Sequence, residues 1–95
     1  MYEGNFKNNT YHGYGKLFLE FNEIYEGLFY KGKRDGYGTL ISPENDYRYC
    51  GNWRNDLKDG NGFEEVKDKY NYQGEFRNGL KSGKGKISKI LLIFS

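Results

Sequence analysis

The chain repeats a short pattern about every 23 residues, and this period limits the fold to an array of small units. The pattern occurs four times and consists of a tyrosine, a glycine two residues later and a large aromatic residue two residues after the glycine. The leading tyrosines are Tyr2, Tyr25, Tyr49 and Tyr72, spaced by 23, 24 and 23 residues. Each copy also holds a Gly-x-Gly pair, at Gly13/Gly15, Gly36/Gly38, Gly60/Gly62 and Gly83/Gly85. Such a period predicts repeats that bury apolar surface only by stacking. Proteins of this kind usually bind ligands on an extended surface.

Composition favours an ordered chain whose buried area comes mainly from aromatic rings. Hydrophobic residues make up only 36% of the sequence, but aromatic residues make up 19%. Disordered chains are poor in aromatic residues, whereas each ring here can bury roughly 150–250 Å² while its tyrosine hydroxyl stays in water. The sequence therefore predicts a small folded unit of 95 residues.

Within each repeat the pattern has a period of two residues, which is the period of a β-strand. Tyr25, Gly27 and Phe29 fall on one face of the first strand. A turn follows at Gly32, where a positive φ is expected, and the equivalent positions hold Asn9, Asp56 and Gly79. Asn and Asp tolerate that conformation best after glycine. The unit is therefore predicted to be a β-hairpin with a loop of several residues.

The glycine pairs have a predicted packing role. Gly36 and Gly38 share a face of the second strand, and a glycine opposite an aromatic residue lets the ring lie flat on the neighbouring backbone. A β-branched residue at Gly38 should block this packing. Four such hairpins give about eight strands at a spacing of ~4.8 Å, an elongated all-β single-layer ribbon of stacked antiparallel hairpins.

At these residues the chain resembles the MORN (membrane occupation and recognition nexus) repeat, whose pattern is roughly Y-x-G-x-[W/F]-x-x-G-x-x-x-G-x-G. The second repeat, 25–38, and the fourth, 72–85, match every position, and the first and third miss only the turn glycine, at Asn9 and Asp56. The resemblance covers residues 2 to about 87. It divides the chain into one array of repeats at about 2–24, 25–48, 49–71 and 72–87, with an apolar tail or cap at 88–95.

The resemblance implies a non-catalytic role. Similar proteins act as scaffolds or adaptors at membranes and the cytoskeleton, and some bind anionic phospholipids. Others are regulatory appendages of enzymes, including phosphatidylinositol phosphate kinases and a protein lysine methyltransferase. We therefore expect a scaffold or adaptor that binds protein partners. A phosphoinositide-binding module and an appendage of a larger enzyme are the alternatives.

The first candidate site is the row of repeated aromatic residues, which could form the core or an open groove for a partner. Trp53 is the strongest single anchor, since Trp and Tyr dominate binding hot spots. The set comprises Tyr2, Phe6, Tyr25, Phe29, Tyr49, Trp53, Tyr72 and Phe76.

The second candidate site is basic. Residues 70–95 carry a local charge of +4, from five Lys/Arg and one acid, whereas the whole chain carries only +2. A cation near an anionic membrane contributes about 1 kcal/mol, and the alternative is that these residues form a solvated face. The expected lipid contacts are Arg54, Arg77, Lys81, Lys84 and Lys86. The small net charge argues against nucleic acid as a partner.

Catalytic and metal chemistry have little support in the sequence. His12 and Cys50 are the only residues of their types and lie in different repeats, whereas a metal site needs several clustered ligands. We expect no enzyme activity, cofactor or metal.

A cytoplasmic location is expected, because the chain has one cysteine, no secretory pattern after Met1 and no apolar run near the ~20 residues of a membrane helix. Peripheral attachment to a membrane or the cytoskeleton is the alternative. The predicted sheet has an edge strand at each end, and because edge strands can pair with another chain, a homodimer is a further expectation.

Overall fold

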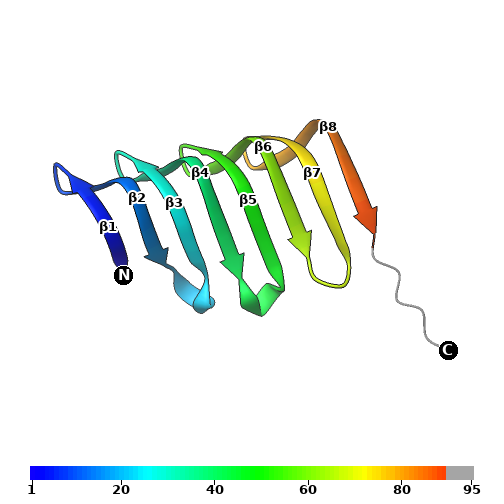
Figure 1. The fold of residues 1–95 in the computed structure, drawn as a ribbon, viewed down its shortest axis with the longest axis horizontal. Helices are drawn as coiled ribbons and strands as arrows, with labels where there is room; N and C mark the ends of the chain where they lie inside the picture. Colours follow the sequence, from blue (N-terminus) through cyan, green and yellow to red (C-terminus); the bar gives the residue numbers. More distant parts are fainter. Residues whose placement is uncertain (90–95) are drawn as a thin grey trace.

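The computed structural model describes residues 1–89 as one open sheet of eight antiparallel strands in sequence order (Figure 1). The predicted all-β ribbon of four stacked hairpins is confirmed. Two single 3₁₀ turns, η1 (Glu20–Asn22) and η2 (Pro43–Asn45), lie in the connections. The strands are β1 (Tyr2–Lys7), β2 (Thr10–Phe18), β3 (Ile24–Tyr30), β4 (Lys33–Ser42), β5 (Tyr47–Arg54), β6 (Leu57–Val66), β7 (Tyr70–Arg77) and β8 (Leu80–Lys89).

The turn inside each repeat contains only two residues, so the predicted loop of several residues is wrong. In the second repeat Tyr30 pairs with Lys33, leaving Lys31 and Gly32 as the turn. Both central residues have positive φ in all four repeats, between 49° and 85°, as in a type I′ turn. That turn is favoured because its twist matches the twist of the paired strands. The positive φ predicted at Asn9, Gly32, Asp56 and Gly79 is confirmed.

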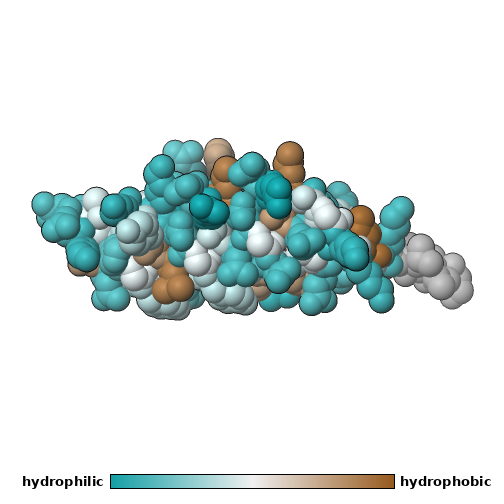
Figure 2. Space-filling model, turned by 90° about the horizontal axis from the view of Figure 1, so that it is seen from above, coloured by the Kyte–Doolittle hydropathy of each residue, from teal (hydrophilic) through white to brown (hydrophobic). Residues whose placement is uncertain are grey.

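The connections between repeats are longer and lie at the opposite end of the sheet (Figure 1). They span residues 19–23, 43–46 and 67–69. The spacing from Tyr25 to Tyr49 is one residue longer than the other two spacings, and the additional residue lies in the connection that holds Pro43, because β4 and β5 pair without a bulge. From the end that carries the two-residue turns, the surface is mostly hydrophilic, with hydrophobic residues in small separate groups (Figure 2).

One face of the sheet, here called the ring face, carries the core. Tyr25, Tyr49 and Tyr72 are buried there, and each hydroxyl donates a hydrogen bond to the carbonyl oxygen three residues later. The Oη–O distances are 2.8, 2.8 and 3.0 Å. The expectation that these hydroxyls stay in water is therefore wrong, because the strand-pairing register shifts at the accepting residue and its carbonyl oxygen receives the hydroxyl. Burial raises the pKa of Tyr25 and Tyr49.

The glycines have the packing role that the sequence predicts. A Cβ atom built on Gly38 would lie less than 3.0 Å from the ring and hydroxyl of Tyr25, and one built on Gly27 would meet the backbone of Gly38. The same relation holds in the other three repeats. A single-layer sheet can bury a whole tyrosine ring because the ring lies directly on bare backbone.

Consecutive repeats interlock through edge-to-face pairs of aromatic rings. Trp53 lies 5.2 Å from Tyr49 of its own repeat and 5.4 Å from Tyr25 of the preceding repeat, measured between ring centroids. Phe29 and Phe76 bridge two tyrosines in the same way. Such pairs contribute about 0.5–1.5 kcal/mol each beyond the area that they bury, so each repeat completes the core of its neighbour.

Candidate functional site

The repeated aromatic residues form the core of the protein and not an open groove. Six of the eight have exposed fractions of 0–5%, and only Tyr2 and Phe6, at the first repeat, reach the surface. Trp53, the expected binding anchor, is 4% exposed, and its Nε1 donates to the carbonyl oxygen of Gly38 at 3.1 Å. A partner that approaches the ring face therefore meets the side chains that cover the rings.

A row of cations provides part of that cover. Arg34, Lys58 and Lys81 occupy equivalent positions, and the Arg34 guanidinium lies 4.5 Å from the ring centroid of Trp53. Arg34 also pairs with Asp56 at 3.2 Å, and Lys81 pairs with Glu64 at 2.9 Å. Cations over aromatic faces stabilise the fold, and their charges are largely neutralised here.

The five expected lipid contacts do not come together. Lys81 lies on the ring face and is paired with Glu64, as described. Arg54, Arg77, Lys84 and Lys86 are exposed, and the pairing register places them on the opposite face, here called the open face. The separation arises because side chains alternate between the faces of a strand. Of the tail or cap expected at 88–95, Ser88 and Lys89 belong to β8, and residues 90–95 lie outside the described residues.

Glu64 is a buried carboxylate held by a cluster of polar groups. It is 5% exposed and stands where two other repeats have Leu17 and Leu40. The hydroxyls of Tyr47 and Tyr70 donate to it at 2.6 and 3.0 Å. Lys58 approaches at 3.4 Å and donates to the Tyr47 hydroxyl, while Lys81 forms the ion pair already described. The third repeat thus buries a carboxylate at a position where Leu17 and Leu40 are half-buried in the first two repeats.

The charge state of Glu64 follows from this cluster. Burial by itself would raise the pKa of Glu64, but hydrogen bonds from Tyr47, Lys81 and Tyr70 and the charge of Lys58 outweigh it and lower the pKa to about 2. Burial also lowers the pKa of Lys58 despite its pairing with Glu64. The carboxylate is therefore ionised at neutral pH, and the cluster stabilises the junction of the third and fourth repeats.

We expect the stability conferred by Glu64 to depend on pH. A carboxylate whose folded pKa lies below its unfolded value stabilises the protein above the unfolded value, 4.5, and loses this effect as pH falls toward about 2. The Glu64→Gln protein should be less stable than wild type at pH 7, by about 3 kcal/mol for a shift of this size. The difference should vanish near pH 2. Urea denaturation across this pH range measures it.

Glu65→Gln is the matched control, because Glu65 is adjacent but lies on the open face and pairs with Arg48 at 3.3 Å near solvent. Such an exposed pair contributes little. A pH-independent gap between wild type and Glu64→Gln, or an equal effect of Glu65→Gln, would contradict the assignment.

Large apolar side chains are denser on the half of the open face formed by the first two repeats than on the other half, which carries Leu57, Phe63 and Leu80 among polar residues. Exposed apolar side chains gather over β2, β3 and β4, outside the aromatic and basic sites that the sequence predicts. Tyr14, Leu28, Tyr37 and Ile41 are 54%, 41%, 58% and 42% exposed. Phe18 and Ile24 lie beside Ile41 in the same cross-strand row. These six residues are here called the apolar half of the open face: Tyr14, Phe18, Ile24, Leu28, Tyr37 and Ile41.

A comparison of the repeats could have revealed this surface from the sequence. The residue between the paired glycines is Tyr14 and Tyr37 in the first two repeats but Asn61 and Lys84 in the last two. Leu28 likewise corresponds to Asn52 in the third repeat. These substitutions leave the core motif unchanged, so a search for the shared pattern overlooks them.

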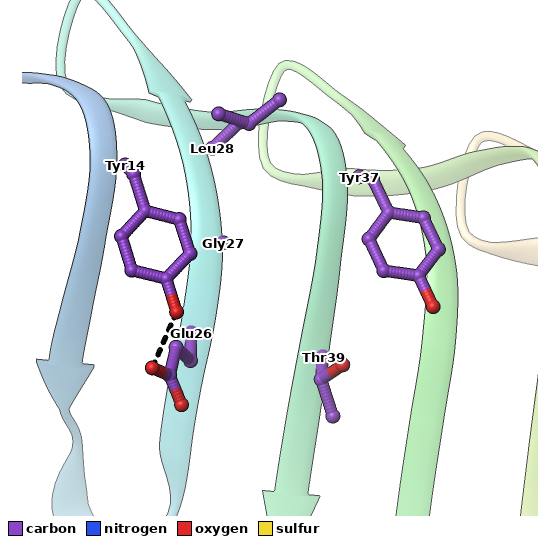
Figure 3. Close-up of a pocket in the computed structure, with 6 residues that line it drawn as sticks. All are labelled: Tyr14, Glu26, Gly27, Leu28, Tyr37 and Thr39. Carbon is purple, nitrogen blue, oxygen red and sulfur yellow. Dashed lines mark hydrogen bonds between the residues drawn. The ribbon is translucent and has the colours of Figure 1, made fainter.

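A shallow pocket of about 410 Å³ lies within the apolar half (Figure 3). Gly27 forms its floor, and the rings of Tyr14 and Tyr37 point in the same direction from neighbouring hairpins (Figure 3). The Tyr14 hydroxyl donates to the Glu26 carboxylate, while Leu28 and Thr39 complete the wall. The floor is bare backbone because Gly27 must be glycine for the core on the other face. The pocket can therefore accept an apolar side chain next to hydrogen-bonding groups.

Within residues 1–89, no group of three or more His, Cys, Asp or Glu side chains is arranged to hold a metal ion. His12 lies on β2 and Cys50 on β5, in different repeats. The same residues include no helix of the length and apolarity required to cross a membrane.

Comparison with known proteins identifies the repeats themselves. No curated protein matches the chain. The family model described as the MORN repeat matches residues 2–18, 25–47, 49–65 and 72–88, one match for each hairpin. These segments cover more than half of the sequence and contain the tyrosines, aromatic residues and glycines that build the core, and the chain therefore belongs to the MORN repeat family.

Proposed function

We propose that this chain is a non-catalytic scaffold module that binds a protein partner through the apolar half of its open face. MORN repeats are generally associated with scaffolds that bind membranes or proteins, and the family is generally non-catalytic. The observation that carries the proposal is the exposure of Tyr14, Leu28, Tyr37 and Ile41 together on one face. Contiguous exposed apolar surface on a small protein marks an interaction site.

The chemistry of this surface suits a partner that presents an apolar side chain next to polar groups. Tyrosines supply large contact area together with a hydroxyl, and they are enriched in binding hot spots. Glu26 and Thr39 at the pocket provide hydrogen-bonding groups that would orient the partner. A second pocket of about 400 Å³ lies on the adjoining half, but Asn52 and Asn61 stand there at the positions of Leu28 and Tyr37, so its lining holds fewer large apolar side chains.

Binding to an anionic membrane is the second candidate, because Arg54, Arg77, Lys84 and Lys86 share the open face and are exposed. Flotation with phosphoinositide-containing vesicles tests it, with Lys84→Glu/Lys86→Glu as the variant. Binding that depends on these lysines and weakens steeply with salt would place membrane attachment above protein binding. A cytoplasmic location with peripheral attachment, and a role as an appendage of a larger enzyme, also remain proposals.

Site-specific photocrosslinking tests the partner-binding surface. A photoreactive amino acid is introduced at Tyr37 in one protein and at Asn61 in another, because the two positions are equivalent in consecutive repeats. In cells that express the chain, we expect position 37 to crosslink to a discrete protein and position 61 to give at most a faint product. Adding Tyr14→Asn and Leu28→Asn should reduce the product at least about tenfold, since hot-spot residues contribute well over 1 kcal/mol each.

Asparagine is a suitable replacement because the third repeat already carries it at both equivalent positions, Asn61 and Asn52. Circular dichroism and the denaturation midpoint confirm that the variant is folded. Equal crosslinking at positions 37 and 61, or a product that survives the two substitutions, would reject the apolar half as the docking surface.

A further inference from the structure

The first and fourth repeats each carry one half of the contact that joins neighbouring repeats, in which an aromatic residue packs against the tyrosine of the preceding repeat. Inside the array, each of Phe29, Trp53 and Phe76 fits between two tyrosines and is only 3–4% exposed. Phe6 has the same position in the first repeat and packs against Tyr2 at 5.0 Å between centroids. It has no preceding tyrosine within residues 1–89 and is 61% exposed.

The other half lies at the fourth repeat. Tyr2, Tyr25 and Tyr49 each contact the aromatic residue of the following repeat, at 5.3, 5.4 and 5.1 Å between centroids. Tyr72 contacts Phe76 of its own repeat at 5.3 Å, and no following aromatic ring is present in the described part of the chain. The Lys81 ammonium lies 5.7 Å from the Tyr72 centroid, as Arg34 lies 5.8 Å from Tyr25.

The strand pairing between consecutive repeats shows how β8 of one copy would pair with β1 of another. At each junction between repeats, the second glycine of the pair lies opposite the glycine of the next tyrosine motif, as Gly38 lies opposite Gly51. The same register would place Gly85 of one copy opposite Gly4 of another. The amides of Gly32, Asp56 and Gly79, at the second turn position of their repeats, each donate to a carbonyl oxygen of the preceding repeat. By the same geometry, the amide of Asn9 of one copy would donate to the carbonyl oxygen of Lys81 of the other.

The charges at the two ends are complementary in this register. Lys16 lies directly opposite Glu26 at the first junction, and the equivalent residues at the ends are Lys86 and Glu3. Both are exposed. Residues 70–95 carry a local charge of +4 and residues 1–69 a charge of −2, so end-to-end approach is electrostatically favoured over contact between two like ends.

We propose that copies of this chain associate head to tail, with β1 of one copy added to β8 of the next and Phe6 inserted beside Tyr72 and Lys81. The contact pairs the outer edges of β1 and β8, the edge strands of the sheet that residues 1–89 form, and strand edges are templates for association. It is heterologous, so it generates an extending series of copies rather than a closed two-fold dimer. This association is independent of the proposed partner surface on the open face and would align those surfaces in a row.

Sedimentation equilibrium of the full chain, without a tag at either end, tests the proposal. The weight-average mass should rise with concentration and show no plateau at a dimer. Phe6→Ala should weaken association at least about tenfold, as expected for an aromatic hot spot. Phe21→Ala is the matched control, because Phe21 is 70% exposed in the β2–β3 connection and should leave association unchanged.

A charge exchange tests the head-to-tail orientation. Glu3→Lys and Lys86→Glu should each weaken association, and both the double variant and an equimolar mixture of the single variants should restore it. A constant monomer mass, a plateau at a dimer, equal loss with Phe21→Ala, or failure of the charge exchange to restore association would each overturn the proposal. Because Glu3, Phe6 and Lys86 are exposed, circular dichroism should show all variants folded.

Discussion

Replacing Gly38 with valine is expected to destabilise the protein by about 3 kcal/mol or more, at the upper end of the range for overpacked cores. The new side chain would occupy the space of the Tyr25 ring, which is fully buried and held by its hydrogen bond to the carbonyl oxygen of Leu28. The ring cannot move aside without giving up its contacts with Phe29 and Trp53. The midpoint and slope of urea denaturation measure the loss.

Thr39→Val is the control, since Thr39 is the next residue on β4 but lies on the open face and is half-buried. Its effect should stay below about 1 kcal/mol, as for most surface changes. Combining Gly38→Val with Tyr25→Ala should destabilise by less than the sum of the two single changes, because one clash is removed. Strict additivity would show that the ring and the glycine do not share this space.

Trp53→Ala is expected to reduce stability by about 3–5 kcal/mol, the usual range for an aromatic residue removed from a core. The substitution breaks the contacts with two tyrosines in consecutive repeats, removes the ring beneath Arg34 and deletes the hydrogen bond to Gly38. Since small domains are stable by only 5–15 kcal/mol, much of the sheet should lose its near-ultraviolet signal. Thermal and urea denaturation report the change.

Trp53→Phe separates the ring from the hydrogen bond. Phenylalanine occupies the equivalent position in the other three repeats, as Phe6, Phe29 and Phe76. This variant should lose only about 1 kcal/mol, mainly the bond from Nε1. If Trp53→Ala were as mild as Trp53→Phe, Trp53 would not be the residue that joins the second and third repeats.

Several expectations from the sequence concerned contacts within one repeat, and the structure confirms them. The shared face of Tyr25, Gly27 and Phe29, the positive φ at the turns and the fit of glycine beneath tyrosine all follow from residues close together in the sequence. Strand alternation and the steric demands of a tight turn determine such features.

The candidate sites depended on which face each side chain joined and on what neighbouring repeats placed beside it. Lys81 and Lys84 are close in sequence, but they lie on opposite faces, so one pairs with Glu64 while the other stays exposed. Glu64 stands where two other repeats have leucine, and its partners Tyr47, Tyr70 and Lys81 come from three other strands. Long-range pairing of this kind cannot be inferred from one repeat.

The sequence by itself determined the architecture, because four in-phase copies of a tyrosine, glycine and aromatic pattern allow few arrangements other than stacked hairpins. Only the tertiary structure decided which residues remain available for binding. A ring such as Trp53 could be core or anchor, and stacking made it core. Tyr14 and Tyr37 each stand between two glycines in the sequence, and the sheet places them together on the open face. Burial depends on neighbours from other repeats, and a local pattern does not specify them.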